Sequence, residues 1–274
     1  MINLAISEDI GNGDHTSLAC IPEVARGSAV LLIKDEGVLA GVGIALSVFK
    51  KIDPLLEVDV YLEDGSYIRP GDIVFAVTGK ICSILQAERL VLNFMQRMSG
   101  IATNTHKYVE QLSGLKTRIL DTRKTTPGLR LIEKEAVKFG GGQNHRIGLY
   151  DMILLKDNHI DFAGGIKNSI NAVTNYLQIN HLDLKFEIEA RTLDDVKEII
   201  DTGMIHRILL DNFSIEDTRK AVELIQGKFE IESSGKITLE NIRKYAECGV
   251  DYISVGALTH HIISLDMSLK ATDF

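Results

Sequence analysis

The chain has 274 residues, of which 45% are hydrophobic and 25% are charged, and its formal net charge is −8. This composition is typical of a globular protein with one large domain or two unequal ones, and it excludes a disordered or fibrous chain. The acidic balance argues against nucleic acid as a partner.

The three cysteines are widely spaced and form no CxxC pair. We therefore expect neither structural disulfides nor structural zinc, as in a reducing compartment. The opening from Met1 to Asp14 lacks the basic start and apolar run of an export signal. The uncharged apolar run from Gly37 to Phe49 has 13 residues, too few for a membrane-spanning helix. These features predict a cytosolic protein.

In chain order, the first element is a predicted loop from Glu8 to Ser17. Short apolar or alternating runs, broken by Asp64-Gly65 and Pro70-Gly71, then predict strands around one helix. A long helix follows, with a kink or break predicted at Ser99-Gly100. The pattern indicates a strand-rich amino-terminal domain and a helical connector. The predicted strands are 28–34, 56–62 and 73–79, and the predicted helices are 44–52 and 83–112.

The second half alternates between apolar strands and amphipathic helices. This alternation predicts a parallel sheet, and six or more repeats favour an α/β barrel over the alternative, an open doubly wound sheet. A final strand, 262–269, is expected to return to the amino-terminal sheet. The predicted strands are 118–120, 152–155, 186–188, 208–210, 229–231 and 252–255, and the predicted helices are 129–139, 167–177, 193–201, 215–225 and 239–247.

Positive charge is concentrated in one stretch of this half. Between Lys116 and His159, nine Lys and Arg residues stand against five Asp and Glu residues, a local charge of +4 that leaves −12 for the rest of the chain. An acidic protein with one cationic island is suited to binding small anions. The alternative is a solvated basic face.

Each predicted strand of this half is followed directly by polar, charged or glycine residues. The carboxyl ends of parallel strands share one rim, where barrel enzymes place their active sites. One group of these residues is cationic and suits a carboxylate or phosphate ligand, although a surface salt bridge is the alternative for any single member. The cationic group is Arg123, Lys124, His145, Arg146 and Lys156.

Two further groups follow the later strands. Glu189 and Asp211 are carboxylates on neighbouring strands that can bind Mg²⁺ or accept ribose hydroxyls; the alternative is an internal partnership with Arg191 or Arg207. At the last two strands, backbone N–H groups beside glycine are typical of phosphate sites, and a plain turn is the alternative. These segments are Ser233-Ser234-Gly235 and Ser254-Val255-Gly256.

Some motifs are absent from the sequence. It contains neither GxGxxG nor GxxxxGK[ST], so neither a dinucleotide-binding fold nor a P-loop is indicated. Gly140-Gly141-Gly142 does not follow a predicted strand. We interpret it as a flexible connector that positions His145 and Arg146.

A specific family pattern accompanies these residues. Its longest block is DTRKTTPGLR, from Asp121 to Arg130. Over nearly its whole length the chain resembles the quinolinate phosphoribosyltransferase family. The other segments that carry the resemblance are Glu8–Ser17, Glu88–Asn93, Ser99–Thr103, Gly141–Arg146, Leu155–His159, Glu187–Glu189, Leu210–Asn212, Ser234–Gly235 and Ser254–Gly256.

The resemblance implies a fold and an activity. The fold would be a sandwich-like amino-terminal α+β domain, 1–99, joined by the returning segment 262–274, and an incomplete, seven-stranded α/β barrel, 100–261. The enzyme would join phosphoribosyl pyrophosphate to quinolinate, release pyrophosphate and carbon dioxide, and form nicotinate mononucleotide for NAD synthesis. It would be a homodimer in which the partner subunit reaches into each active site.

The resemblance also implies roles for single residues. Arg123, His145, Arg146 and Lys156 would line the quinolinate site beside Thr122, with Arg89 arriving from the neighbouring chain. Lys124, Glu189 and Asp211 would be catalytic and would meet the ribosyl pyrophosphate and its Mg²⁺. The segments Ser233–Gly235 and Ser254–Gly256 would hold the 5-phosphate.

The chemistry of the residues agrees with these roles. Paired hydrogen bonds from Arg123 and Arg146 match two adjacent carboxylates. Loss of pyrophosphate builds positive charge on the ribose and negative charge on the leaving group, which acids and cations respectively can stabilise. Two alternatives stay open: a related phosphoribosyltransferase acting on nicotinate or another anionic ligand, and a non-catalytic barrel that senses phosphoribosyl metabolites.

Overall fold

The computed structural model describes residues 1–272, and these form two compact units. The first unit contains Met1–His106, Thr125–Gly141 and the chain from Ala257 onward, and the second contains Lys107–Lys124 and Gly142–Gly256. Residues 125–141 therefore group with the first unit, whereas the sequence predicts them within the barrel domain. None of the helices among residues 1–272 is both long enough and apolar enough to cross a membrane.

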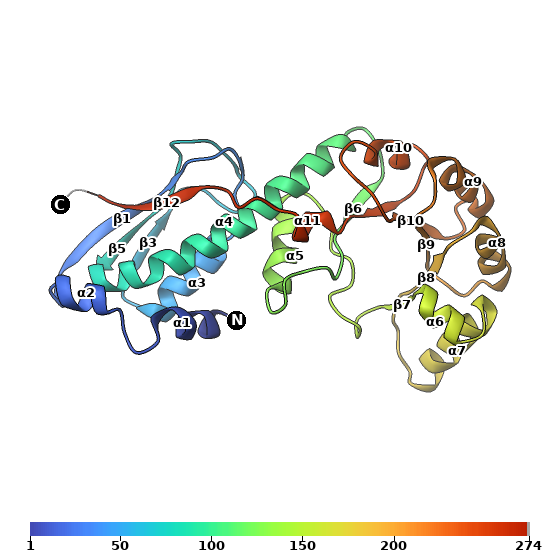
Figure 1. Ribbon diagram of the computed structural model, residues 1–274, viewed down its shortest axis with the longest axis horizontal. Coiled ribbons are helices and arrows are strands. Elements are labelled where there is room, and N and C mark those ends of the chain that lie inside the picture. Colours follow the sequence, from blue (N-terminus) through green and yellow to red (C-terminus); the bar gives the residue numbers. More distant parts are fainter. Residues whose placement is uncertain (273–274) are drawn as a thin grey trace. The chain divides into compact units, whose positions relative to one another are not determined.

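The first unit is built on a four-stranded antiparallel sheet with the strand order β12-β1-β5-β3 (Figure 1). Alternate residues of β1 are buried, including Leu31 and Ile33, as expected for a sheet with one face against a core. Phe49 and Phe75 pack edge to face in that core, with ring centroids 5.6 Å apart. The strands are β1 (Arg26–Ile33), β3 (Glu57–Val60), β5 (Ile73–Lys80) and β12 (Met267–Ala271), with β2 (Gly37–Val38) and β4 (Tyr67–Ile68) forming a separate pair.

The predicted loop from Glu8 to Ser17 is confined to residues 11–14, and the chain on either side of it is helical. Helix α1 spans Ile2–Ile10 and helix α2 spans His15–Cys20. Asp14 ends the intervening turn and caps α2, because its carboxylate accepts a hydrogen bond from the backbone N–H of Ser17 at 3.1 Å. The sequence signal for this start is the Asp followed three residues later by a serine, a common cap arrangement.

Helix α4 runs without interruption over Ile81–Gln111, so of the predicted kink or break at Ser99-Gly100 the break does not occur. The Ser99 hydroxyl accepts a hydrogen bond from the Ala40 N–H at 2.9 Å and donates to the Ala40 carbonyl at 3.1 Å. A Cβ atom on Gly100 would lie 2.3 Å from the carbonyl oxygen of Ile263. These small residues therefore allow neighbouring backbone to pack against the helix.

Two other segments of the first unit come from later in the chain. Strand β12 pairs antiparallel with β1, with Leu269 opposite Leu31, so the chain returns to the first sheet as predicted. It spans Met267–Ala271, whereas the predicted strand is 262–269. Residues 273 and 274 of the returning segment lie outside the described residues. Helix α5 (Arg130–Phe139) is anchored by Glu133. That buried carboxylate accepts hydrogen bonds from Arg97 and from the N–H of Thr126.

The second unit is built on a six-stranded parallel sheet with the order β6-β11-β10-β9-β8-β7. An isolated parallel bridge joins Gln143 to Leu120 at the free edge of β6. The described residues thus form six strands and one bridge, where the family resemblance implies seven strands. The six are β6 (Arg118–Leu120), β7 (Ile153–Leu155), β8 (Phe186–Ala190), β9 (Arg207–Asp211), β10 (Glu230–Ser234) and β11 (Tyr252–Ser254).

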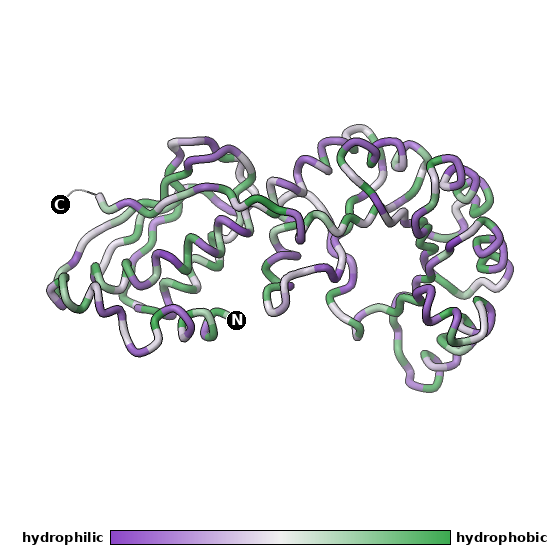
Figure 2. Tube along the Cα trace, viewed as in Figure 1, coloured by the Kyte–Doolittle hydropathy of each residue, from purple (hydrophilic) through white to green (hydrophobic). Residues whose placement is uncertain are grey.

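Helices cover the outer face of this curved sheet (Figure 1). Hydrophilic and hydrophobic residues alternate along them (Figure 2), and the apolar positions of α8, such as Val196 and Ile199, are buried. Side chains of Thr192 and Ser214 cap α8 and α9 by accepting N–H hydrogen bonds three residues on. The helices are α6 (Asp157–Phe162), α7 (Ile166–Ile179), α8 (Leu193–Thr202), α9 (Ile215–Ile225) and α10 (Ile242–Ala246).

The strands of this sheet carry charged residues at alternate, buried positions. On β8, Glu187 and Glu189 alternate with Phe186, Ile188 and Ala190, and all five residues are buried. The apolar face of the strand lies under the helices, so the two glutamates point to the inner face.

Candidate active site

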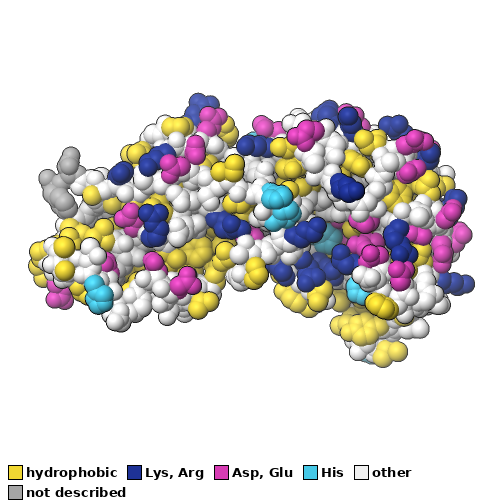
Figure 3. Space-filling model, viewed as in Figure 1, with side chains coloured by type: hydrophobic (Ala, Val, Ile, Leu, Met, Phe, Trp, Pro, Cys, Tyr) yellow, Lys and Arg dark blue, Asp and Glu magenta, His cyan; other side chains and the backbone are white. Residues whose placement is uncertain are grey.

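The strand ends of the second unit bring most of the predicted site residues together. In the parallel register, Ser234 lies beside Asp211 and Ser254 beside Leu120, so the segments that follow these strands leave the sheet at the same edge. Lys and Arg side chains gather on the visible face of this unit, with acidic side chains beside them (Figure 3). Arg89 is an exposed residue of α4, a helix that begins in the first unit.

Arg146 and Arg123 form the cationic part of the site. Arg146 is only 8% exposed, and its guanidinium donates to the Met152 carbonyl at 3.3 Å. Burial lowers the pKa of Arg146, and the positive charge of Arg123 lowers it further. The protein thus holds a desolvated cation close to a second cation, which favours binding of an anion that neutralises both.

Glu189 is held firmly by its neighbours. Lys156 Nζ lies 3.2 Å from Glu189 Oε1, and the backbone N–H of Asp157 donates to Oε2 at 3.0 Å. Glu189 is buried, whereas the Lys156 side chain is 48% exposed. Lys156 therefore reaches from this anchored carboxylate toward solvent at the rim.

The alternative interpretation of Glu189 and Asp211 is an internal ion pair with Arg191 or Arg207. Both arginines instead pair with other acids. Arg191 forms a bidentate pair with Asp161 at 3.0 Å. Arg207 donates to two glutamates of β10, at 2.9 Å to Glu232 and at 3.0 Å to Glu230. Asp211 accepts a hydrogen bond from the side chain of its neighbour, Asn212, at 2.8 Å. Neither arginine is therefore the partner of these carboxylates: Glu189 is bonded to Lys156 and to the Asp157 N–H, and Asp211 to Asn212. Their carboxylate oxygens are of the kind that Mg²⁺ or a hydroxyl group prefers.

The ends of β10 and β11 form a tightly packed turn region. The hydroxyl of Ser254 donates to that of Ser234 at 3.0 Å, and the Asn212 N–H donates to the Ser234 carbonyl at 2.9 Å. Gly235 has a φ of +91°, and a Cβ atom there would lie 2.4 Å from Asn212 Oδ1. Only glycine fits this position without displacing its neighbour.

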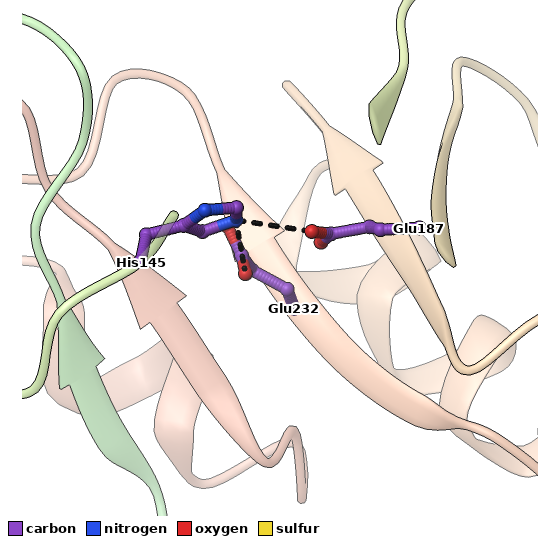
Figure 4. Close-up of side chains that lie close together, drawn as sticks. All are labelled: His145, Glu187 and Glu232. Carbon is purple, nitrogen blue, oxygen red and sulfur yellow. Dashed lines mark hydrogen bonds and ion pairs between the residues drawn. The ribbon is translucent and has the colours of Figure 1, made fainter. Parts of the chain in front are cut away.

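Below the rim lies a polar cluster formed by His145, Glu187 and Glu232. The sequence predicts His145 among the cations of the rim, but its side chain is directed into the interior; Glu187 and Glu232 are not predicted as site residues. His145 Nε2 lies 3.0 Å from Glu187 Oε2 and 3.5 Å from Glu232 Oε2 (Figure 4). Both glutamate side chains are fully buried, and the His145 side chain is 7% exposed. Burial raises the pKa of Glu187 and that of Glu232 to about 7. The available sequence signal is a pair of acids at mid-strand positions that alternate with apolar residues.

The ligand atoms of His145, Glu187 and Glu232 lie within 4.8 Å of one another, a spacing that a metal ion can bridge. Two of these three residues also accept hydrogen bonds from other groups of the protein. Arg207 donates to Glu232, and the backbone N–H of Arg146 donates to His145 Nδ1 at 2.7 Å. The cluster is therefore a hydrogen-bonded network with its own internal cation.

Comparison with known proteins places the chain in a family. The family model for the quinolinate phosphoribosyl transferase C-terminal domain matches residues 101–270, and the model for the N-terminal domain matches residues 14–99. The chain belongs to the quinolinate phosphoribosyltransferase family.

Relatives in this family match the chain over almost all of its length. The nicotinate-nucleotide pyrophosphorylase [carboxylating], chloroplastic, of Oryza sativa subsp. japonica is 46% identical and aligns with 98% of this chain and 76% of its own. The probable enzyme of the same name from Bacillus subtilis (strain 168) is 39% identical over 99% and 92%. The crystal structure of NadC from Streptococcus pyogenes superposes with a TM-score of 0.94 at 38% identity, covering 99% and 96%. The α/β architecture of this family member is thus that of a solved relative.

Proposed function

We propose that this member of the quinolinate phosphoribosyltransferase family transfers the phosphoribosyl group of phosphoribosyl pyrophosphate to quinolinate, with release of pyrophosphate and carbon dioxide. The product is nicotinate mononucleotide, for NAD synthesis. The observation that carries the proposal is the buried Arg146 beside Arg123, whose mutual repulsion a dicarboxylate relieves. Relatives that are 39% and 46% identical bear the name of this activity.

Quinolinate has two adjacent carboxylates and therefore needs more cationic contacts than a monocarboxylate does. Arg123 and Arg146 supply paired donors, and Lys156, held by Glu189 at 3.2 Å, supplies a third positive charge. Thr122 and the backbone around His145 complete this part of the site. The cations orient the pyridine nitrogen toward the ribose carbon, which is the main task in such a transfer.

Phosphoribosyl pyrophosphate occupies the remaining part of the rim under this proposal. The segments Ser233–Gly235 and Ser254–Gly256 receive the 5-phosphate, with Gly235 allowing close approach of backbone. Lys124 faces the pyrophosphate. Glu189 and Asp211 would hold Mg²⁺, because carboxylate oxygens are the ligands that it prefers, and Glu189 also pairs with Lys156 at 3.2 Å. The ion would supply positive charge next to the departing pyrophosphate.

The bond changes follow from these contacts. The ribose C1–oxygen bond breaks, its electron pair leaves with pyrophosphate, and the ring nitrogen forms the new bond to C1. Glu189 and Asp211 stabilise the positive charge that develops on the ribose. The ring nitrogen is then cationic, so the adjacent carboxylate leaves as carbon dioxide, and the electron pair left on the ring carbon takes up a proton.

We also propose a homodimer in which Arg89 of one subunit contributes to the site of the other. Arg89 is exposed on α4 of the first unit, as a residue that reaches a neighbouring chain must be. The acidic, disulfide-free sequence fits the cytosol, although relatives from plants are named for the chloroplast or the mitochondrion.

The test is release of carbon dioxide from quinolinate labelled in the carboxylate next to the nitrogen. Release that requires both phosphoribosyl pyrophosphate and Mg²⁺ supports the proposal. Equal turnover of nicotinate without carbon dioxide would instead identify a nicotinate phosphoribosyltransferase. Ligand-induced stabilisation without any pyrophosphate release would identify a binding protein.

A further inference from the structure

The polar cluster inside the sheet of the second unit connects to the rim through one short segment. His145 and Arg146 are consecutive, yet the His145 side chain is directed toward Glu187 and Glu232 in the interior (Figure 4), while Arg146 belongs to the cationic part of the site. An interaction made by the histidine ring therefore acts on the backbone of the residue that carries the guanidinium.

The hydrogen bonds select one tautomer of His145. Its Nδ1 accepts the backbone N–H of Arg146 at 2.7 Å, so Nδ1 carries no hydrogen; two donors would otherwise face each other. The ring is then neutral, with its hydrogen on Nε2, and that hydrogen is donated to the nearer carboxylate, Glu187, at 3.0 Å. A carboxylate that receives this hydrogen fixes both the tautomer and the ring orientation.

Glu187, rather than Glu232, is the acceptor of the His145 Nε2 hydrogen. Glu232 lies farther from the ring, at 3.5 Å, and receives the Arg207 guanidinium at 2.9 Å. Among the described residues, Glu187 Oε1 has no hydrogen-bond partner, and Oε2 is its bonded oxygen. Burial of a carboxylate is costly unless the group is paired and hydrogen-bonded, so the bond from His145 is an important partner of Glu187.

The backbone before the His145 ring is also held by a buried acid. Asp121, fully buried after β6, accepts the His145 backbone N–H at 2.8 Å and the Asn144 amide at 2.6 Å. The peptide groups of His145 and Arg146 are thus held by two buried acids, Asp121 through the backbone and Glu187 through the imidazole ring. These two restraints hold the backbone that leads to the Arg146 side chain.

We infer that Glu187 is a positioning residue for quinolinate: through the neutral His145 ring it sets the backbone of Arg146 and hence the direction of its guanidinium. This inference rests on the proposed function, since it assumes that Arg146 receives a carboxylate of quinolinate. The competing interpretation is a buried polar cluster that only stabilises the fold.

Glu187→Gln and Glu187→Ala distinguish the two. Glutamine keeps an oxygen that accepts the Nε2 hydrogen, whereas alanine removes it. We expect Glu187→Ala to raise the KM for quinolinate at least tenfold with less than threefold change in the KM for phosphoribosyl pyrophosphate, and Glu187→Gln to restore most of the loss. Glu230→Ala is the control, because Glu230 is an acid of the same sheet that pairs with Arg207 and has no contact with His145 in the described structure; it should leave both KM values within threefold.

A second measurement does not depend on turnover. ¹⁵N NMR of the His145 ring should show the Nε2–H tautomer in the wild type and in Glu187→Gln, and a mixture in Glu187→Ala. Equal rises in both KM values, or no rise in the KM for quinolinate once the tautomer is lost, would overturn the inference. Zinc binding by the unliganded wild type that Glu187→Ala abolishes would overturn it too, in favour of a metal site. If the wild type does not convert quinolinate at all, the proposed function fails, whatever the NMR spectra show.

Discussion

Replacing Arg146 by methionine should separate binding from stability. Methionine keeps an unbranched apolar stem and removes the guanidinium. Arg146 can donate two charge-assisted hydrogen bonds to one carboxylate, each contributing about 1.5 kcal/mol or more. The loss is therefore about 3 kcal/mol, or roughly a 100-fold rise in the Kd for quinolinate. Phosphoribosyl pyrophosphate should bind with an unchanged Kd, because its groups meet other residues.

The same substitution should not destabilise the unliganded protein. Burial and the charge of Arg123 lower the pKa of Arg146, so the fold disfavours the cation that the site requires. The free energy gained by removing a buried charge should offset the free energy lost with the packing of the arginine side chain. Functional residues in other proteins likewise lower the stability of the folded state.

Calorimetric titration with each substrate and urea unfolding test both parts. Arg191→Met is the matched control, since Arg191 forms an exposed pair with Asp161, and such pairs contribute only about 0–1 kcal/mol. A variant Arg146→Met that binds quinolinate normally but unfolds about 2 kcal/mol more easily would refute the reasoning and make Arg146 a structural residue.

Three further predictions concern the acids and the shared site. Asp211→Asn removes a charge with little change in shape, and it should lower kcat by ~100-fold while the Kd for quinolinate, measured by titration, stays constant. Arg89→Ala and Lys156→Ala should each be inactive alone, but mixed subunits should regain activity after exchange because one composite site is intact; continued inactivity after proven exchange would argue against sharing. The folded protein holds the Glu232 proton up to a pKa of about 7, against an ordinary 4.5, so the free energy of unfolding should fall as pH rises between these values, by about 1.4 kcal/mol for each pKa unit of elevation. Glu232→Gln should flatten that slope in urea unfolding, and an unchanged slope would contradict the assignment.

The sequence predicts the repeating part of the fold well. All six parallel strands form at their predicted places, with bounds that agree to within three residues, because each contains a short apolar or alternating run. The rim is predictable for the same reason, since the polar residue after each such run has to lie at the carboxyl edge of the sheet.

The errors have a different cause. Ser99-Gly100 is equally consistent with a break and with close packing against a helix, and only the Ala40 backbone that packs there decides between them. Glu187 and Glu232 were missed because acids are ordinarily exposed. Their burial depends on Arg207 and His145, which are distant in sequence and approach only in the folded sheet.

The pairing of β12 with β1 has a consequence for synthesis of the protein. The first sheet is completed by Met267–Ala271, which emerge from the ribosome after the entire parallel sheet has been made. Until then β1 is an open edge of apolar strand, and open edges invite pairing with other chains. A nascent chain stalled shortly before Met267 should therefore be prone to aggregation even though the residues of its catalytic rim have all been translated.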